Sequence, residues 1–314
     1  MATEVIADFA PADMTLYMKK GLDVLRADLH LNKWALPFTM ERNSGKNVRA
    51  YRVGTLSPAT SALTEATAPS VTAMTGTTYT ATLAQYGAVN TFSDILEAIG
   101  PSSFMEQQSQ IFGIQGAETL ETLSYNELVS NASAFYANGA DAGTFSSNSV
   151  LTSRDFRRLA KQFRAKKVRG MQDDKMFRLL LAPDVAFDVT SDDVVGSVTD
   201  LQKRDPDDKK WKDVIAVYGG VAAFTSQLVA SAVVGTNNIT AYQNIACGYG
   251  AFAAFDLKGM PFRLMLVPPD DINVSNPLGL VGAVGWKVAF AAKYLGGDGP
   301  RAYVVNAVSS EPTA

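Results

Sequence analysis

The alternation of apolar and polar positions predicts both helices and strands along this chain. In residues 12–29 four leucines recur at helical spacing with charges opposite, which predicts an amphipathic helix, either an N-terminal arm or a first core helix. Another helical pattern begins at Pro101, since proline is tolerated at a first helical position, and continues to about Ser130. We therefore expect one long helix in this region.

A strand pattern lies between these two helices. The stretch TTYTATLAQY, residues 77–86, alternates with period two, and Pro58 and Pro69 exclude a helix across the Thr-rich segment before it. We expect a hairpin with a long, irregular tip over Tyr51–Gly87. Such an excursion is uncommon inside a compact domain, so it is either disordered or lies on another molecule.

A basic amphipathic helix is predicted within Arg154–Arg169. Thr152 or Ser153 is expected to cap it, with Asp155 in the first turn. At about 100° per residue its bases gather on the face opposite its apolar residues. The basic face comprises Arg154, Arg157, Arg158, Lys161 and Arg164. This face has two possible roles: it contacts phosphates or acidic groups, or it is a solvated surface. The sequence alone favours the solvated surface.

Short strands are predicted in the C-terminal half. An apolar strand near Leu179 is stopped by Pro183, and strands rich in Val, Ala and aromatic residues follow in 276–295 and 301–308. Strands and helices alternate without the regular βα repeat of a parallel-sheet enzyme. The predicted fold class is therefore α+β.

Composition changes this picture in three ways. With 314 residues the chain exceeds the usual size of one hydrophobic core, which favours two lobes. A net charge of −3 argues against a general nucleic-acid binder. A single cysteine, Cys247, and a single histidine, His30, exclude an internal disulfide and a Cys/His zinc site.

Two features argue against export and membrane insertion. The N-terminal residues carry acids where a signal peptide carries bases. The stretch Tyr218–Gly235 is uncharged but has Thr225, Ser226 and Gln227 at its centre. We expect a soluble protein.

Charge is distributed unevenly along the chain. No Lys or Arg occurs between Arg52 and Arg154, whereas that span holds eight acids, and Val214–Phe255 holds no charged residue. Ordinary monomers spread charge more evenly over their surface. Long uncharged segments therefore suggest a surface that partner subunits cover.

One motif suggests dinucleotide chemistry. Gly248, Gly250 and Ala253 have the G-x-G-x-x-A spacing of a turn that cradles pyrophosphate, and Asp270 lies where a ribose-binding acid is expected. However, Pro261 would break the helix that the phosphate requires. We predict instead a loop that crosses between buried strands.

Other catalytic arrangements are also weak. His30 falls on the predicted N-terminal helix rather than in a loop, as a core or surface histidine would. Adjacent acids at Asp173–Asp174, Asp192–Asp193 and Asp270–Asp271 lack a partner motif and are expected in solvated turns. We therefore predict that the protein is not an enzyme and that it has no catalytic residue, no cofactor and no metal site.

A succession of segments extends from about Leu16 to Val308. They are LTEATAPSVTAMTGTTYTATLAQYG, SDILEA, the long helix, LTSRDFRRLAKQF, LLLAPDVAFD, CGYGAFA and NPLGLVGAVGWKVA. In this order, rather than through any single motif, the chain resembles the major capsid proteins of tailed bacteriophages. The subgroup that it resembles most is that of the coliphage N-four type.

The resemblance implies the Hong Kong 97-like fold with an N-terminal arm, an extended loop, a spine helix and two domains. The implied ranges are 1–50 for the arm, 51–87 for the extended β-hairpin loop, 88–139 and 269–314 for the peripheral domain, 101–130 for its spine helix, and 140–268 for the axial domain. It also implies self-assembly into hexamers and pentamers of an icosahedral head that encloses the genome.

The resemblance further implies contacts and partners. Candidate inter-subunit contacts are Glu65, Tyr79, Ala81 and Leu83 in the hairpin and Arg154, Arg157, Arg158 and Lys161 on the basic helix. Some relatives cross-link subunits through a lysine of the extended loop, but none occurs here between Lys46 and Lys161. Too little chain precedes Tyr51 for a fused scaffolding segment, which implies a separate scaffolding protein.

Further implied partners are a portal, a decoration protein and packaged double-stranded DNA without sequence-specific contact, with no membrane. The location implied is the virion capsid, assembled in the host cytoplasm. Two alternatives stay open: a cellular nanocompartment shell of the same fold, and a nucleotide-binding enzyme.

Overall fold

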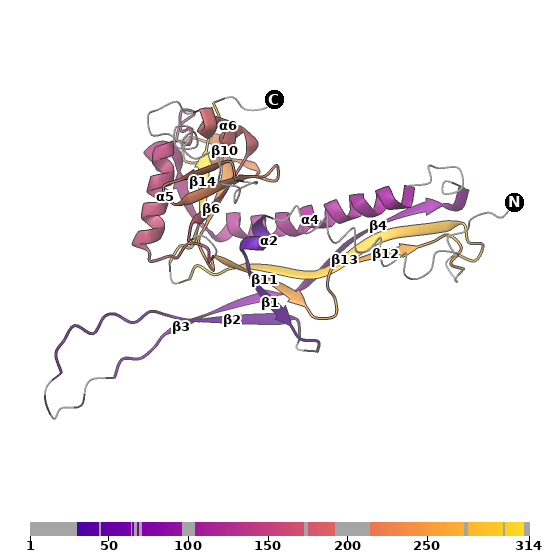
Figure 1. Cartoon of the computed structure of the whole chain (residues 1–314), viewed down its shortest axis with the longest axis horizontal. Coiled ribbons are helices and arrows are strands. Elements are labelled where there is room, and N and C mark those ends of the chain that lie inside the picture. The colour runs from indigo at the N-terminus through magenta and orange to yellow at the C-terminus, as the bar shows by residue number, and fades with distance from the viewer. Residues whose placement is uncertain are drawn as a thin grey trace, which may run out of the picture.

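The computed structural model describes residues 30–43, 45–63, 65, 68, 71–95, 104–172, 175–191, 214–272, 276–297 and 299–310. The helix predicted over 12–29 and the acidic pairs at 173–174 and 192–193 lie outside these residues. Figure 1 shows a compact lobe, an elongated sheet along which one long helix runs, and a hairpin that projects beyond both.

The elongated part is a five-stranded sheet of order β1-β11-β13-β12, with β4 paired to β13 outside this path. Its strands are β1 (Leu36–Met40), β4 (Ala84–Ser93), β11 (Phe252–Leu257), β12 (Arg263–Val267) and β13 (Val281–Tyr294). β13 is antiparallel to β4, β11 and β12, whereas β1 runs parallel to β11. β13 therefore organises this sheet.

The long helix α4 (Phe104–Asn131) lies along the five-stranded sheet, as Figure 1 shows. Trp286 of β13 donates a hydrogen bond of 3.0 Å through Nε1 to Oε1 of Gln115, and its ring stacks on Phe262. The sequence predicts this helix over 101–130, and the structure has it from Phe104 to Asn131.

The compact lobe is a seven-stranded sheet of order β5-β14-β10-β6-β8-β7, with β9 paired to β10. Its strands are β5 (Ser133–Tyr136), β6 (Phe177–Leu181), β7 (Ala216–Tyr218), β8 (Val221–Thr225), β9 (Ser231–Val234), β10 (Ile239–Cys247) and β14 (Ala302–Ala307). The mixture of helices with largely antiparallel sheets is α+β, as predicted.

Helices α5 (Ser153–Ala165) and α6 (Pro183–Ser191) pack on the compact lobe. Phe163 of α5 stacks on Phe177 with ring centroids 4.5 Å apart and meets Tyr303 edge-on. The sequence predicts only that Pro183 stops a strand; the structure shows that Pro183 is also the first residue of a helix, α6. The short helices α2 (Leu31–Trp34) and η2 (Ala137–Gly139) complete the described elements.

The uncharged segment Val214–Phe255 forms β7 to β10 and part of β11, and many of its side chains are buried within this chain. In β8, Val221, Ala222 and Ala223 are fully buried. The interpretation that partner subunits cover this segment is therefore wrong for its buried residues. Its lack of charge largely reflects the protein's own core.

Strand membership also differs from the predicted domain ranges. β11 and β12, expected in the axial range 140–268, pair with β13, and β14, expected in the peripheral range 269–314, lies between β5 and β10. The reason is that, after the first passage from β4 through α4 to β5, the chain crosses between the two sheets twice more, at 248–251 and at 295–301. We call these two crossing segments the joint. The division into peripheral and axial domains stays a prediction.

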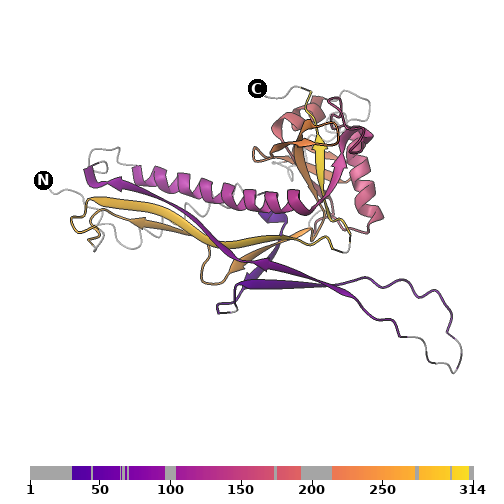
Figure 2. The same ribbon diagram turned by 180° about the vertical axis from the view of Figure 1, so that it is seen from behind.

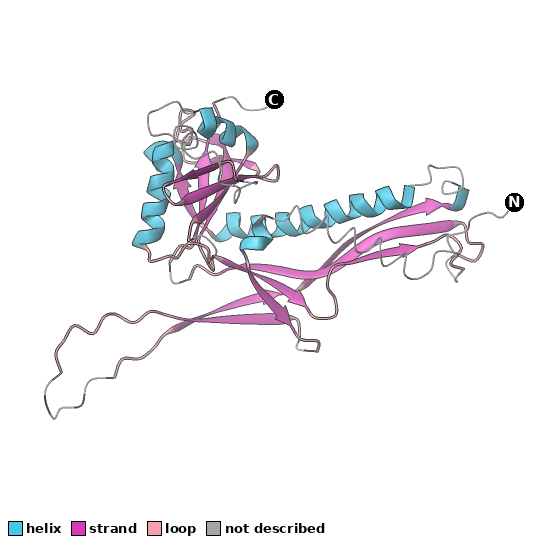
Figure 3. Ribbon diagram, viewed as in Figure 1, coloured by secondary structure: helices cyan, strands magenta, loops and turns pink. Residues whose placement is uncertain are grey.

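The projecting hairpin consists of β2 (Asn47–Val53) and β3 (Gly76–Thr82), which pair antiparallel. The prediction of Tyr51–Gly87 begins later than β2, and it includes the start of β4, which belongs to the five-stranded sheet. Figure 2 shows from behind how far the connecting loop extends, and Figure 3 separates this loop from the paired strands.

Candidate assembly surfaces

We call the paired strands β2 and β3 the root of the hairpin, and one face of the root packs within its own chain near the end of β3. Ala81 is 5% and Leu83 7% exposed, and both lie in a small apolar cluster with Met40, Phe255 and Leu295. The sequence predicts Ala81 and Leu83 as contacts with a neighbouring subunit. Their burial instead gives them the role of fixing the hairpin to the five-stranded sheet, because the strand period reveals an inward face but not what covers it.

Tyr79 and Arg52 connect the root to the joint. The hydroxyl of Tyr79 accepts a hydrogen bond of 2.7 Å from the backbone N of Gly297, and the guanidinium of Arg52 lies 5.8 Å from the centroid of the Tyr79 ring. Arg52 donates to the carbonyl oxygen of Leu295 and, at 2.9 Å, to that of Gly250. Tyr79 therefore has partners inside this chain.

The loop of the hairpin carries apolar side chains in an exposed position. Leu63 is 78%, Val71 96% and Met74 69% exposed. Glu65, the single charged residue between Gly54 and Thr75, is exposed as well. Several exposed apolar residues on one projecting loop are typical of a surface that another molecule covers.

Asp155 organises the start of α5. Its carboxylate accepts hydrogen bonds from the backbone N of Thr152 at 3.1 Å and of Asn138 at 2.9 Å, and from Nη1 of Arg158 at 2.6 Å. Thr152 and Asp155 form a capping box, which confirms Thr152 rather than Ser153 as the cap. A buried carboxylate with this many donors fixes both the helix start and the side chain of Arg158.

The basic face of α5 contains two kinds of residue. Arg157 donates to the hydroxyl of Tyr218 and lies 4.9 Å from that ring's centroid, and Arg158 pairs with Asp155. These two arginines therefore have partners in their own chain, which the sequence analysis did not foresee. Their contact with a neighbour stays a prediction.

Arg154 and Lys161 differ from these two arginines. Both are exposed, and within the described residues neither has a hydrogen bond or an ion pair. Their charges are available to a partner or to solvent. Among the predicted contact residues on α5, these two form no ion pair within the described part of the chain.

The G-x-G-x-x-A segment is one of the two crossings of the joint. β10 ends at Cys247 and β11 begins at Phe252, so a strand and not a helix follows Gly250. Gly250 has a φ of +67°, and a Cβ added at Gly248 would lie 2.3 Å from Cγ1 of Val168. The two glycines allow the backbone to turn and to pass close to Val168 where the chain crosses between the sheets. The predicted loop between buried strands is confirmed.

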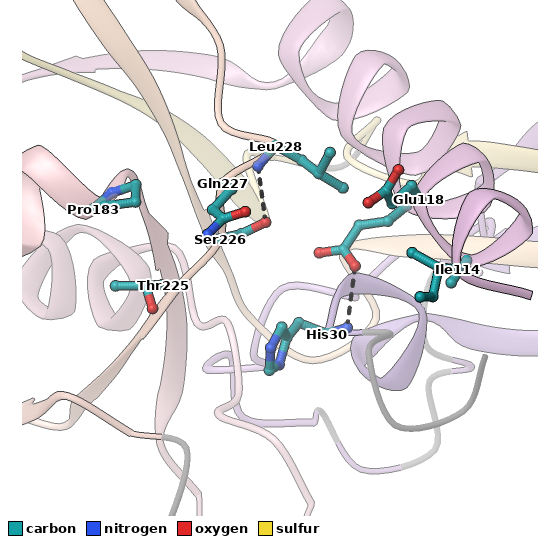
Figure 4. Close-up of a pocket in the computed structure, with 10 residues that line it drawn as sticks. His30, Ile114, Glu118, Pro183, Thr225, Ser226, Gln227 and Leu228 are labelled. Carbon is teal, nitrogen blue, oxygen red and sulfur yellow. Dashed lines mark hydrogen bonds between the residues drawn. The ribbon is translucent and has the colours of Figure 1, made fainter. Parts of the chain in front are cut away.

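An open cavity of about 510 Å³ lies between α4 and the compact lobe, and Figure 4 shows side chains around it. His30 and Ser226 line this cavity. The backbone N of His30 donates to Oε2 of Glu121 at 3.4 Å, and the ring of His30 lies 6.0 Å from that of Phe224. The hydroxyl of Ser226 accepts a hydrogen bond from the backbone N of Leu228. These contacts hold α2 against the lobe and shape a turn.

The other chemical candidates are also structural. Cys247 is buried, and burial raises the pKa of its thiol. Asp270 and Asp271 are exposed next to a turn, as predicted. In the part of the chain that the structure describes, no cluster of three or more His, Cys, Asp or Glu residues could hold a metal ion. The same residues contain no helix that is long and apolar enough to cross a membrane.

No protein family and no curated protein matches the sequence, but solved structures do. The capsid of Ralstonia phage GP4 is similar with a TM-score of 0.70 and 10% identity, over 91% of this chain and 90% of that chain. The head structure of Helicobacter pylori bacteriophage KHP40 has a TM-score of 0.64 and 9% identity, over 86% and 88%. The Cyanophage Pam1 capsid has a TM-score of 0.62 and 12% identity, over 92% and 93%.

These likenesses define the fold. The chain has the fold of bacteriophage capsid proteins. The sequence predicts two surfaces that are exposed among the described residues, the hairpin loop and part of the basic face of α5. It does not predict the role of Arg52, whose one signal is its place as the last base before the span without Lys or Arg.

Proposed function

We propose that the protein is the major capsid protein of a tailed double-stranded DNA bacteriophage, with the Hong Kong 97-like fold. The observation that carries the proposal is the likeness to the GP4 capsid over 91% of the chain. The exposed apolar loop of the hairpin supports it, because a shell protein must bury such surface against its neighbours. In this function the protein is structural and not an enzyme.

The proposal includes hexamers and pentamers of an icosahedral head that is assembled in the host cytoplasm and encloses packaged DNA without sequence-specific contact. The N-terminal arm would be the part of 1–50 that precedes β1, because β1 belongs to the five-stranded sheet and β2 to the hairpin. The hairpin would be the extended loop and α4 the spine helix. The five-stranded sheet would belong to the peripheral domain and the seven-stranded sheet to the axial domain. Membership of the coliphage N-four-type subgroup, and scaffolding, portal and decoration proteins as partners, are part of the same proposal.

Two surfaces would make the inter-subunit contacts. The loop tip with Glu65 would lie on a neighbour, while Tyr79, Ala81 and Leu83 act indirectly by holding the hairpin root. Arg154 and Lys161, with Arg157 and Arg158 beside them, would face acidic groups of a neighbour. Charge pairs of this kind set register and specificity more than affinity.

Assembly of the purified chain tests the proposal. We expect closed shells or capsomers in light scattering and electron microscopy at high concentration, with a scaffolding partner added when one is identified. A chain that stays monomeric under all these conditions contradicts it. Particles that hold enzyme cargo instead of DNA would indicate a nanocompartment, and saturable thermal stabilisation by NAD or ATP would indicate a nucleotide-binding protein.

A further inference from the structure

The two segments of the joint lie side by side. The backbone N of Gly248 donates to the carbonyl oxygen of Arg301 at 2.9 Å, and the backbone N of Leu295 donates to that of Ala251 at 2.8 Å. The two crossing segments are therefore hydrogen-bonded to each other, in addition to being continuous with the strands that they connect. A change in the angle between the two sheets must displace both.

The hairpin root bonds to both segments of the joint at once. Arg52 donates to Gly250 in the first segment and to Leu295 in the second, and Tyr79 accepts from Gly297 in the second. A guanidinium is a planar fork with five donors, so one side chain can bridge two carbonyl oxygens that lie on different segments. These bonds join the hairpin to the place where the sheets meet.

The root is paired along its whole length. β2 and β3 pair without interruption from Asn47 with Thr82 to Val53 with Gly76, and Leu83 donates its backbone N to the carbonyl of Lys46 at 3.0 Å. The long loop projects from the far end of these strands, as Figure 2 shows. A displacement of the loop is therefore carried to Arg52 and Tyr79 rather than absorbed between the strands.

We propose that Arg52 and Tyr79 couple the position of the hairpin to the joint, so that the hairpin and the angle between the two sheets change together. The coupling goes beyond the proposed function, because it needs one folded chain and no assembly. It gives the chain a way to transmit what happens at the hairpin loop to the compact lobe. By linkage, the joint must influence the hairpin to the same extent.

Hydrogen exchange of the dispersed, full-length chain tests the coupling, with mass spectrometry as the readout. In Arg52→Gln we expect amide exchange in 248–251 and 295–301 to rise by about fivefold or more, the change expected when hydrogen bonds of ordinary net strength are lost. Arg52→Lys should restore protection in part, because an ammonium keeps the charge but not the fork. Arg49→Gln is the matched control, since Arg49 is exposed on the same strand and carries the same charge.

Two milder variants keep the test decisive if Arg52→Gln does not fold. Tyr79→Phe removes one hydroxyl and should raise exchange at Gly297 and through both segments of the joint. Tyr294→Phe removes the hydroxyl that accepts a hydrogen bond of 3.2 Å from the backbone N of Arg301. This variant should raise amide exchange in β2 and β3. The coupling is overturned if Tyr79→Phe leaves exchange in 248–251 unchanged and Tyr294→Phe leaves exchange in β2 and β3 unchanged. Neither result depends on shell formation, so the proposed function stands or fails separately.

Discussion

The hydroxyl of Tyr125 donates a hydrogen bond of 2.8 Å to the carbonyl oxygen of Gln243 and accepts one of 3.1 Å from the amide of Ala230. One phenol thus joins α4 to the compact lobe at a buried position. We expect Tyr125→Phe to lower the free energy of unfolding by about 1–3 kcal/mol, because two part-buried hydrogen bonds of the phenol are lost. Urea unfolding measures this. Tyr51→Phe, at a ring that is 66% exposed, is the control and should stay within about 0.5 kcal/mol.

The same residue predicts a pH dependence of stability. Burial raises the pKa of Tyr125 from 10.0 to about 12, against the opposing hydrogen bond from Ala230. Folding therefore favours the neutral phenol, so its contribution is complete below pH 10.0 and is lost as the pH rises through about 12. The free energy of unfolding should fall over this window.

Tyr125→Phe isolates the contribution of this phenol. Burial also raises the pKa values of Tyr294 and Tyr303, so some decline will remain in the variant. We expect the parent to decline more steeply than the variant in denaturant titrations across the window. Parallel curves would show that Tyr125 does not cause the dependence.

Asp155 should be the most sensitive residue of α5. Asp155→Ala removes the acceptor for Asn138 and Thr152 and leaves Arg158 unpaired. We expect the free energy of unfolding to fall by about 2–4 kcal/mol, because the helix loses its cap and buried donors lose their acceptor. Solvent can hydrate the partly exposed Arg158, which limits the loss. Circular dichroism during urea unfolding measures it. Asp270→Ala, in an exposed turn, should change stability by less than about 0.5 kcal/mol, and equal losses would contradict the role of the buried carboxylate.

The hairpin loop should change its accessibility on assembly. A glutamate-specific protease can cut after Glu65, and thermolysin can cut near Leu63 or Val71, whereas trypsin has no site between Arg52 and Arg154. We expect rapid cleavage of the unassembled chain and strong protection in the particle, since docking excludes water from the loop. Equal cleavage rates in the two states would mean that no neighbour covers it.

Charge reversal on α5 should separate two roles of its basic face. Arg154→Glu with Lys161→Glu should reduce particle yield while the free energy of unfolding stays unchanged, because like charges cost several kcal/mol at an interface and an exposed pair is worth under about 1 kcal/mol. Reversal of Arg157 and Arg158 should also lower stability, since their partners Tyr218 and Asp155 lie in the same chain.

Reversal of two exposed bases elsewhere, Lys33 and Arg49, controls for net charge in this comparison. It should leave the stability unchanged and the yield closer to that of the parent. Normal yield from the Arg154 and Lys161 variant would show that this face is an ordinary solvated surface.

Local features of the fold could be predicted from the sequence. α5 follows from its two faces and from the Thr152–Asp155 capping box, and most of α4 follows from its helical period. The loop through Gly248 and Gly250 follows from the proline that leaves no room for a helix. In each case the residues that decide the structure lie within a few positions of one another.

Long-range features could not be predicted in this way. β1 pairs with β11, and β14 enters the sheet of β10, because of contacts between distant parts of the chain. Composition alone does not distinguish burial within a chain from burial against a partner. For that reason the sequence suggests subunit contacts for Leu83 and the segment Val214–Phe255, although Leu83 and much of that segment are buried in the protein's own fold.

The place of β14 has a consequence for synthesis on the ribosome. Val305 of β14 pairs with Phe135 on one side and Asn244 on the other. Among the described strands β14 is made last, yet it fills an interior position of the seven-stranded sheet. Until it emerges, β5 and β10 both have an open edge, and two nascent chains on one messenger could pair through these edges. The compact lobe is thus completed late, and a chaperone that shields β10 would act before that moment.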